Sequence, residues 1–121
     1  MKVRLVVPQS GINSTNENLI TFIQLAEKEK FESFRVFDRM LYPLNPQQPY
    51  PGTPDKREWP DYFQNVLDPL TTLAFITAHT SNAKLGTCII DMLFHNPVTL
   101  AKEFTTYILI GLINVVPFHA C

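Results

Sequence analysis

The sequence is poor in cysteine, glycine and charge, and each shortage excludes a class of protein. Its 121 residues include two cysteines, four glycines, and 10 Lys+Arg against 11 Asp+Glu. Cys88 and Cys121 are too few for a disulfide framework, and without a C-x-x-C pair they indicate no structural metal. The net charge of −1, with basic residues scattered along the chain, predicts that nucleic acid is not a partner.

The common nucleotide-binding and hydrolase motifs are also absent. The chain has no G-x-G-x-x-G and no G-x-x-x-x-G-K-[ST], so a Rossmann fingerprint and a P-loop are excluded. It has neither a G-x-S-x-G elbow nor an H-E-x-x-H pair. Motifs alone therefore identify no catalytic residue.

Long hydrophobic runs are scarce as well. The first one, residues 3–7, is too short for a secretory signal, which makes a cytoplasmic location the expectation. Residues 104–121 contain no Asp, Glu, Lys or Arg. A membrane span needs roughly 20 apolar residues, and Gly111, Asn114 and Pro117 interrupt this segment. A buried strand or helix end is favoured over a membrane anchor.

What the chain does have is an alternation of short apolar runs and helical patterns. Apolar, β-branched runs predict buried strands over residues 3–7, 34–37 and 84–90, with a further strand over 112–116. Ser14 followed by Glu17 fits a capping box that opens a helix. Asp68-Pro69 and Asn96-Pro97 are typical of an N-cap followed by proline at the first helical position. This order predicts a single α/β domain with parallel strands and outer helices.

Residues 40–67 interrupt the alternation with a loop rich in proline and aromatic side chains. Six of the ten prolines of the chain lie here, so regular structure cannot run through it. Loops of this length in compact domains are usually functional or disordered. The aromatic residues predict a loop that packs against another part of the molecule; they are Tyr42, Tyr50, Trp59, Tyr62 and Phe63.

In parallel α/β folds, ligands bind at the carboxyl ends of the strands, and a few polar residues of this chain are predicted to lie there. Asp38 follows the second strand, where an acid can contact a cofactor or orient a base. It can equally be a loop-capping aspartate paired with Arg35 or Arg39. Cys88 is either a reactive thiol or a small buried hydrophobe. His95, just before the third helix, fits a ligand-facing position or a structural hydrogen bond.

Several stretches of the sequence, taken together, resemble those of a known protein family. The stretches FDRMLYPL, PYPGTPD and LDPLTTLAF, in this order, are preceded by VRLVVPQSG and followed by HNPVTLAKEF. In these stretches the chain resembles the N-terminal part of the luciferase-like monooxygenase superfamily, especially its branch of coenzyme F420-dependent oxidoreductases. The resemblance covers most of residues 3–104.

The resemblance implies the N-terminal half of a TIM-type (β/α)8 barrel, an oxidoreductase activity, a small-molecule substrate, and coenzyme F420 or FMN as cofactor. By position, Asp38 would face the cofactor. The third strand would carry a bulge and a cis non-prolyl bond at Cys88-Ile89 behind the cofactor ring. The cofactor-binding set is then Asp38, Gly86, Thr87, Cys88 and Ile89. The proline-rich loop would line the substrate entrance, with Arg39 and Tyr42 as substrate-binding residues.

Two residues depart from the family pattern. Lys30 stands where the family usually has glycine at a helix end, so a left-handed cap would be strained here. Arg39 replaces a histidine that several deazaflavin enzymes of the group carry, which leaves the catalytic base open.

The match also stops near Thr106. We therefore expect a partial barrel of about three βα units over residues 1–106 and a divergent apolar tail over residues 107–121. A complete barrel needs roughly 250 residues, and its phosphate-binding loops follow strands seven and eight. The sequence thus predicts a truncated, inactive oxidoreductase fragment. The alternative is a non-catalytic half-barrel that dimerises through its exposed edge or docks on a full-length paralogue.

Overall fold

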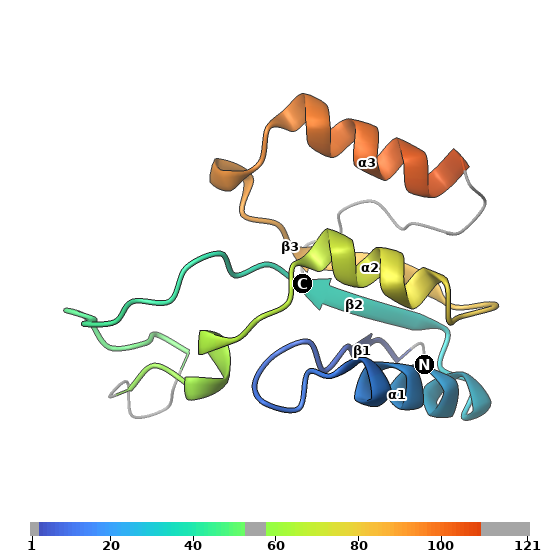
Figure 1. Ribbon diagram of the computed structural model, residues 1–121, viewed down its shortest axis with the longest axis horizontal. Helices are drawn as coiled ribbons and strands as arrows, with labels where there is room; N and C mark the ends of the chain where they lie inside the picture. Colours follow the sequence, from blue (N-terminus) through green and yellow to red (C-terminus); the bar gives the residue numbers. More distant parts are fainter. Residues whose placement is uncertain (1–2, 53–57, 110–121) are drawn as a thin grey trace.

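The computed structural model describes residues 3–52 and 58–109 and contains one parallel sheet of three strands (Figure 1). The strands lie in the order β1 (Leu5–Val6), β2 (Ser33–Phe37), β3 (Lys84–Ile89). Both pairings are parallel. The helices are α1 (Asn16–Lys28), α2 (Pro69–Thr77) and α3 (Pro97–Leu109), with short 3-10 turns at Asp61–Gln64 and Met92–Phe94. The architecture confirms the predicted α/β class, with the parallel strands and outer helices of a partial TIM-type barrel.

All three helices begin at a side chain that caps them. Asp68 accepts a hydrogen bond from the Thr71 amide at 2.7 Å, and Asn96 accepts from the amides of residues 98 and 99, so both predicted caps are confirmed. The predicted capping box at Ser14 is wrong by one residue. The Ser14 hydroxyl donates to the Gly11 carbonyl instead, and Thr15 becomes the N-cap of α1.

The two faces of the sheet differ. Phe34 and Val36 of β2 point toward α1 and α2 and are fully buried. Residues of the opposite face, which would be the interior of a barrel, are more open: Val6 and Ile89 expose 53% and 60% of their surfaces. The core thus lies between the sheet and its helices, and Val6 and Ile89 of the other face are open to solvent.

The C-terminus of α1 adopts the strained conformation expected from its sequence. The Phe31 amide donates to the Ala26 carbonyl and the Lys30 amide to the Glu27 carbonyl, a Schellman motif that places Lys30 in the left-handed region at φ 63°. A side chain with a Cβ atom costs about 1 kcal/mol there, and glycine avoids most of this cost.

Lys30→Gly is therefore expected to raise the free energy of unfolding by about 0.5–1 kcal/mol, measured by urea denaturation. Lys30→Ala is the matched control, because it removes the charged side chain and keeps the Cβ atom. An equal gain from both variants would assign the effect to the lysine side chain rather than to backbone strain.

One carboxylate joins the end of α1 to the turn between α2 and β3. Glu27 accepts hydrogen bonds from the Thr80 hydroxyl and from the amides of Ser81, Asn82 and Ala83. Burial raises the pKa of Glu27, but these four hydrogen bonds outweigh it, and the net pKa lies below the usual 4.5.

A lowered pKa in the folded state means that Glu27 stabilises the fold above its unfolded pKa and loses this effect as the pH falls through the folded value. Glu27→Gln is expected to cost about 1 kcal/mol at neutral pH. The difference from wild type should shrink below about pH 4, the region of an ordinary glutamate pKa. The urea midpoints of wild type and Glu27→Gln, measured across this pH range, test this prediction. A difference that is independent of pH would show that the carboxylate charge contributes nothing.

The predicted boundary at Thr106 falls inside a helix, because α3 continues to Leu109. The predicted strand over residues 112–116 lies outside the described residues. Within residues 3–52 and 58–109, no helix is long and apolar enough to cross a membrane.

Candidate functional site

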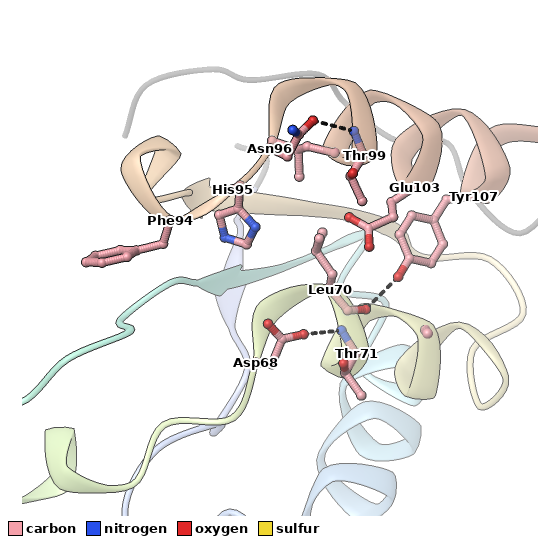
Figure 2. Close-up of a pocket in the computed structure, with 11 residues that line it drawn as sticks. Asp68, Leu70, Thr71, Phe94, His95, Asn96, Thr99, Glu103 and Tyr107 are labelled. Carbon is pink, nitrogen blue, oxygen red and sulfur yellow. Dashed lines mark hydrogen bonds between the residues drawn. The ribbon is translucent and has the colours of Figure 1, made fainter.

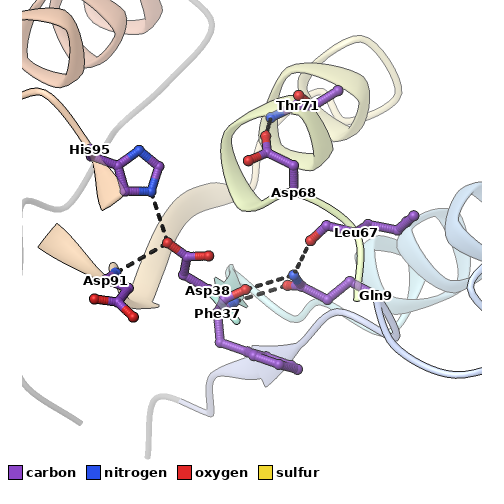
Figure 3. Close-up of polar contacts among 8 residues, drawn as sticks. All are labelled: Gln9, Phe37, Asp38, Leu67, Asp68, Thr71, Asp91 and His95. Carbon is purple, nitrogen blue, oxygen red and sulfur yellow. Dashed lines mark hydrogen bonds and ion pairs between the residues drawn. The ribbon is translucent and has the colours of Figure 1, made fainter. Parts of the chain in front are cut away.

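Asp38 lies directly after β2 and forms the centre of a polar cluster at the carboxyl ends of the strands (Figure 3). Its Oδ2 atom lies 2.8 Å from Nε2 of His95 and accepts a hydrogen bond from the Asp91 amide at 3.1 Å. Its side chain is 2% exposed and that of His95 is 14% exposed. Among the described residues no arginine forms an ion pair with Asp38, so the expected pairing of Asp38 with Arg35 or Arg39 is wrong.

The local sequence explains why His95 reaches Asp38. The backbone of β3 ends at Ile89, and the Asp38 amide donates to the Ile89 carbonyl at 3.1 Å. A short 3-10 turn then reverses the chain, and the Asn96 cap fixes the start of α3 immediately after the histidine. His95 is thereby held between two rigid elements, above the end of the neighbouring strand.

The hydrogen bond to Asp38 also selects one tautomer of a neutral imidazole ring. An ionised carboxylate can only accept a hydrogen bond, so Nε2 of His95 carries a proton. When the ring is neutral, the other ring nitrogen, Nδ1, is an unprotonated acceptor. A carboxylate that orients an imidazole in this way is the arrangement of a general base and its positioning partner.

Gln9 is a site residue that the sequence interpretation did not single out. It follows β1 and is fully buried. Its amide donates to the carbonyls of Phe37 and Leu67 at 2.7 and 3.0 Å, and it accepts from the Phe37 amide at 2.9 Å. These three bonds tie the ends of β1 and β2 to the end of the long loop. The sequence feature that could have indicated Gln9 is its place as a polar residue soon after a predicted strand.

The third strand carries the predicted bulge. Val36 pairs with Thr87 and the next residue, Phe37, pairs with Ile89, so Cys88 is the extra residue on β3. The predicted cis bond at Cys88-Ile89 is wrong, since the described residues contain no cis peptide bond. The bulge absorbs the extra residue with trans peptides.

The other predicted cofactor residues divide between the two faces of β3. Gly86 pairs with Arg35 on the face that would be the barrel interior, and Ile89 shares that face beyond the bulge. Thr87 is 4% exposed and, by the alternation of a strand, shares the helix-covered face with Leu85. Of these residues only Ile89 is placed beside Asp38, through the hydrogen bond of its carbonyl, and Thr87 faces away from the side of Gly86 and Ile89.

Arg39 and Tyr42, predicted to bind substrate, belong to an aromatic cluster built by the long loop. The Arg39 guanidinium carbon lies 4.0 Å from the centre of the Phe63 ring and 5.5 Å from that of Trp59. The Tyr42 ring packs edge-on against Trp59. Such cation–π contacts are worth about 0.5–2 kcal/mol each. The described part of the loop thus places several aromatic rings around Arg39, and it lies beyond the end of β2 (Figure 1).

A pocket of about 470 Å³ opens between α2 and α3, with His95 in its wall (Figure 2). Its described lining residues include the acids Asp68 and Glu103, the rings of Phe94 and Tyr107, and no lysine or arginine. Burial raises the pKa of Tyr107, and the carboxylates of Glu103 and Asp68 raise it further. The pocket therefore has a negative electrostatic character and an apolar wall. No group of three or more His, Cys, Asp or Glu side chains in the described ranges could hold a metal ion.

Comparison with known proteins places the chain in a family. Residues 4–107 match the luciferase-like monooxygenase family. An uncharacterised protein of Mycobacterium bovis and uncharacterised proteins of two Mycobacterium tuberculosis strains are each 34% identical to it over 83 residues. The match covers 69% of this chain but only 29% of each relative. No solved structure matches significantly. The chain belongs to the luciferase-like monooxygenase family.

Proposed function

We propose that this chain supplies part of the cofactor pocket of a flavin- or deazaflavin-dependent oxidoreductase that acts on a small molecule. The observation that carries the proposal is the Asp38–His95 pair, held at 2.8 Å at the carboxyl ends of the strands in a chain of this family. In barrels of this type the carboxyl ends of the strands hold the reacting groups. A bound flavin or deazaflavin would supply hydride transfer.

The residues near this edge fit the ring of such a cofactor. Arg35 is 4% exposed, and its Nε and Nη1 atoms are buried without a hydrogen-bond partner. Because Phe34 and Val36 face the helices, Arg35 faces the side of the barrel interior. Its free donors suit the electron-rich carbonyl edge of a flavin or deazaflavin ring. The apolar side chains of Val6 and Ile89 on the same face offer contacts to the flat ring.

Within residues 3–52 and 58–109, the phosphate end of the cofactor has no comparable partner. The described residues contain no glycine-rich loop against a helix N-terminus of the kind that cradles phosphate. The chain by itself would therefore contact the ring of the cofactor and leave its phosphate in water. We infer that the isolated chain is inactive and that catalysis requires the remaining barrel strands.

Fluorescence titration with FMN, with riboflavin and with coenzyme F420 tests this proposal. We expect FMN and riboflavin to bind with dissociation constants within about threefold of each other, a difference of under 1 kcal/mol. Arg35→Met should weaken both at least tenfold, whereas Lys102→Met on the exposed side of α3 should have no effect. Absence of binding to the folded chain would contradict the proposal, and much tighter binding of FMN would reveal a phosphate site in this chain.

A second candidate is a module that associates with another copy of the chain. In the described residues β1 and β3 each pair only with β2, which leaves two open strand edges beside the exposed Val6 and Ile89. Sedimentation over a range of concentrations tests this candidate. Val6→Lys should lower the association, and Leu44→Lys, in the exposed loop, serves as the control. A monomer at every concentration would exclude it.

A further inference from the structure

The Arg39 guanidinium is held in place by aromatic rings. Its central carbon lies 4.0 Å from the centre of the Phe63 ring, 5.5 Å from that of Trp59 and 5.7 Å from that of Tyr50. A cation–π contact is an attraction between the charge and the electrons of the ring, and it needs no N–H donor. The three rings therefore fix the position of a positive charge and leave the donors in the plane of the guanidinium for another partner.

The Arg39 side chain lacks an acceptor among the described residues. Its Nε atom is buried without a hydrogen-bond partner, and no described acid forms an ion pair with it. The neighbouring Asp38 is not available, because its carboxylate is turned toward His95 and the Asp91 amide (Figure 3). A buried donor without a partner is unfavourable. This guanidinium is therefore prepared to bind an anion that brings the missing acceptors.

The aromatic contacts place Arg39 on the side of the sheet that would be the barrel interior. Along β2, Phe37 points away from the helices, because its neighbour Val36 is buried against them. Phe63 packs edge-on against Phe37, with 6.2 Å between the ring centres, and also contacts the Arg39 guanidinium. Arg39 therefore lies beyond the carboxyl end of β2 on the same side as Arg35, the residue that we place at the cofactor ring.

We propose that Arg39 binds the carboxylate of the substrate, and that the substrate class is a small carboxylic acid with an apolar body. This inference rests on the proposed function and deepens it by naming what the oxidoreductase acts on. Four residues of extended chain span at most about 14 Å, so a molecule beside a cofactor ring at Arg35 is within reach of Arg39. The planar donors of a guanidinium match the two oxygens of a carboxylate.

The charge and the surroundings of Arg39 favour a carboxylate over a phosphate. Residues 40–52 and 58–67 contain no lysine or arginine, so this part of the loop adds no second positive charge. A phosphate monoester carries a charge of about −1.5 to −2 at pH 7, which one guanidinium does not neutralise, whereas a carboxylate is matched by it. The half-buried rings of Tyr50 and Trp59 offer contact to an apolar body. An aromatic carboxylate meets all of these conditions.

Titration of the chain with benzoate, without cofactor, tests this inference through the fluorescence of Trp59, the single tryptophan. We expect benzoate to bind at least about tenfold more tightly than benzamide, which has a similar shape and no charge. Arg39→Met should weaken benzoate binding by a similar factor, and Arg39→Lys, which keeps the charge and loses the planar donors, should weaken it less. Arg4→Met is the matched control, because Arg4 is exposed and precedes β1, at the opposite end of the strands. Equal binding of benzoate and benzamide would overturn the proposal.

Nitrogen-15 NMR of the unaltered chain gives a readout that does not depend on the folding of a variant. The Nε resonance of Arg39 should move on addition of benzoate and stay in place on addition of benzamide. The Nε resonance of Arg4 should stay in place with both. Movement of the Trp59 resonances without that of Arg39 Nε would mean that benzoate contacts the rings alone, and the role of the guanidinium would be overturned.

Further ligands separate this inference from its alternatives. If inorganic phosphate moves the Arg39 resonance at the same concentration as benzoate, the carboxylate class is overturned. If Arg39→Met weakens FMN and leaves riboflavin unchanged, the guanidinium holds the cofactor phosphate and not a substrate. Benzoate binding without flavin binding would leave the carboxylate site standing and the proposed oxidoreductase function without support. Flavin binding without a response to benzoate would leave the proposed function standing and overturn the carboxylate site.

Discussion

Asp38→Ala is expected to lower the free energy of unfolding by about 2–4 kcal/mol. The Asp38 side chain is 2% exposed and is the acceptor for both Nε2 of His95 and the Asp91 amide. Alanine would leave these two donors without a partner in a place that water reaches poorly. A buried donor without a partner costs about 1–3 kcal/mol. The loss should be concentrated in residues 91–96, because Asp38 holds this segment to β2.

Urea unfolding measures the total effect, and hydrogen exchange locates it. We expect the Asp91 amide to lose its protection in the variant, while amides in α1 keep theirs apart from the general loss of stability. Asp61→Ala is the matched control, since Asp61 is exposed and its carboxylate accepts a hydrogen bond from the nearby Gln64 side chain. That change should stay within about 0.5 kcal/mol. Comparable losses from both variants would mean that the Asp38 contacts contribute little.

A double-mutant cycle separates the Asp38–His95 contact from the rest. His95→Ala should cost less in the Asp38→Ala background than in wild type, with a coupling of about 1–2 kcal/mol. If the two single effects add without coupling, the 2.8 Å contact is not energetically significant, and the proposed positioning of the imidazole would lose its basis.

The strands and helix starts could be predicted from sequence because short-range patterns determine them. Three apolar runs each contain one strand, but the prediction of a buried first strand is wrong, because β1 covers only Leu5–Val6 and Val6 is 53% exposed. The Asp68-Pro69 and Asn96-Pro97 pairs mark helix starts through local hydrogen bonds. The shift of the first cap from Ser14 to Thr15 has a local cause too. The turn at Gly11, with φ 80°, brings its carbonyl to the Ser14 hydroxyl. No pattern in the sequence specified that turn.

The candidate site was only half predictable. Asp38 and His95 were both candidates by position. The sequence does not indicate whether the Asp38 carboxylate contacts one of two nearby arginines or a histidine 57 residues away. The register of β2 and β3, together with the bulge at Cys88, brings them together. The same applies to Arg39, whose neighbour Phe63 is supplied by the folding of the proline-rich loop.

A substitution at Gln9 is the second for which we expect a large loss of stability. Gln9→Leu is expected to cost about 3–5 kcal/mol, although leucine has a similar volume. The substitution removes three hydrogen bonds and leaves the Phe37 amide, the Phe37 carbonyl and the Leu67 carbonyl without partners at a fully buried position. Because the backbone of Gln9 also pairs with Leu67 at 2.9 Å, the end of the long loop would loosen from β1. Urea unfolding measures the loss, and limited proteolysis within residues 58–67 reports the loosening.

Gln9→Glu distinguishes hydrogen bonding from packing at the same position. The introduced carboxyl has the shape of the amide, but in its ionised form it cannot donate to the two carbonyls, and its charge would be buried. Its pKa should rise in the folded state, so the variant should become less stable as the pH rises through the unfolded value of about 4.3. Gln24→Glu on the exposed side of α1 is the control and should change stability by no more than about 0.5 kcal/mol. If Gln9→Glu were as stable as wild type at neutral pH, Gln9 would act through its volume alone, and the ends of β1 and β2 would have to be held by backbone pairing.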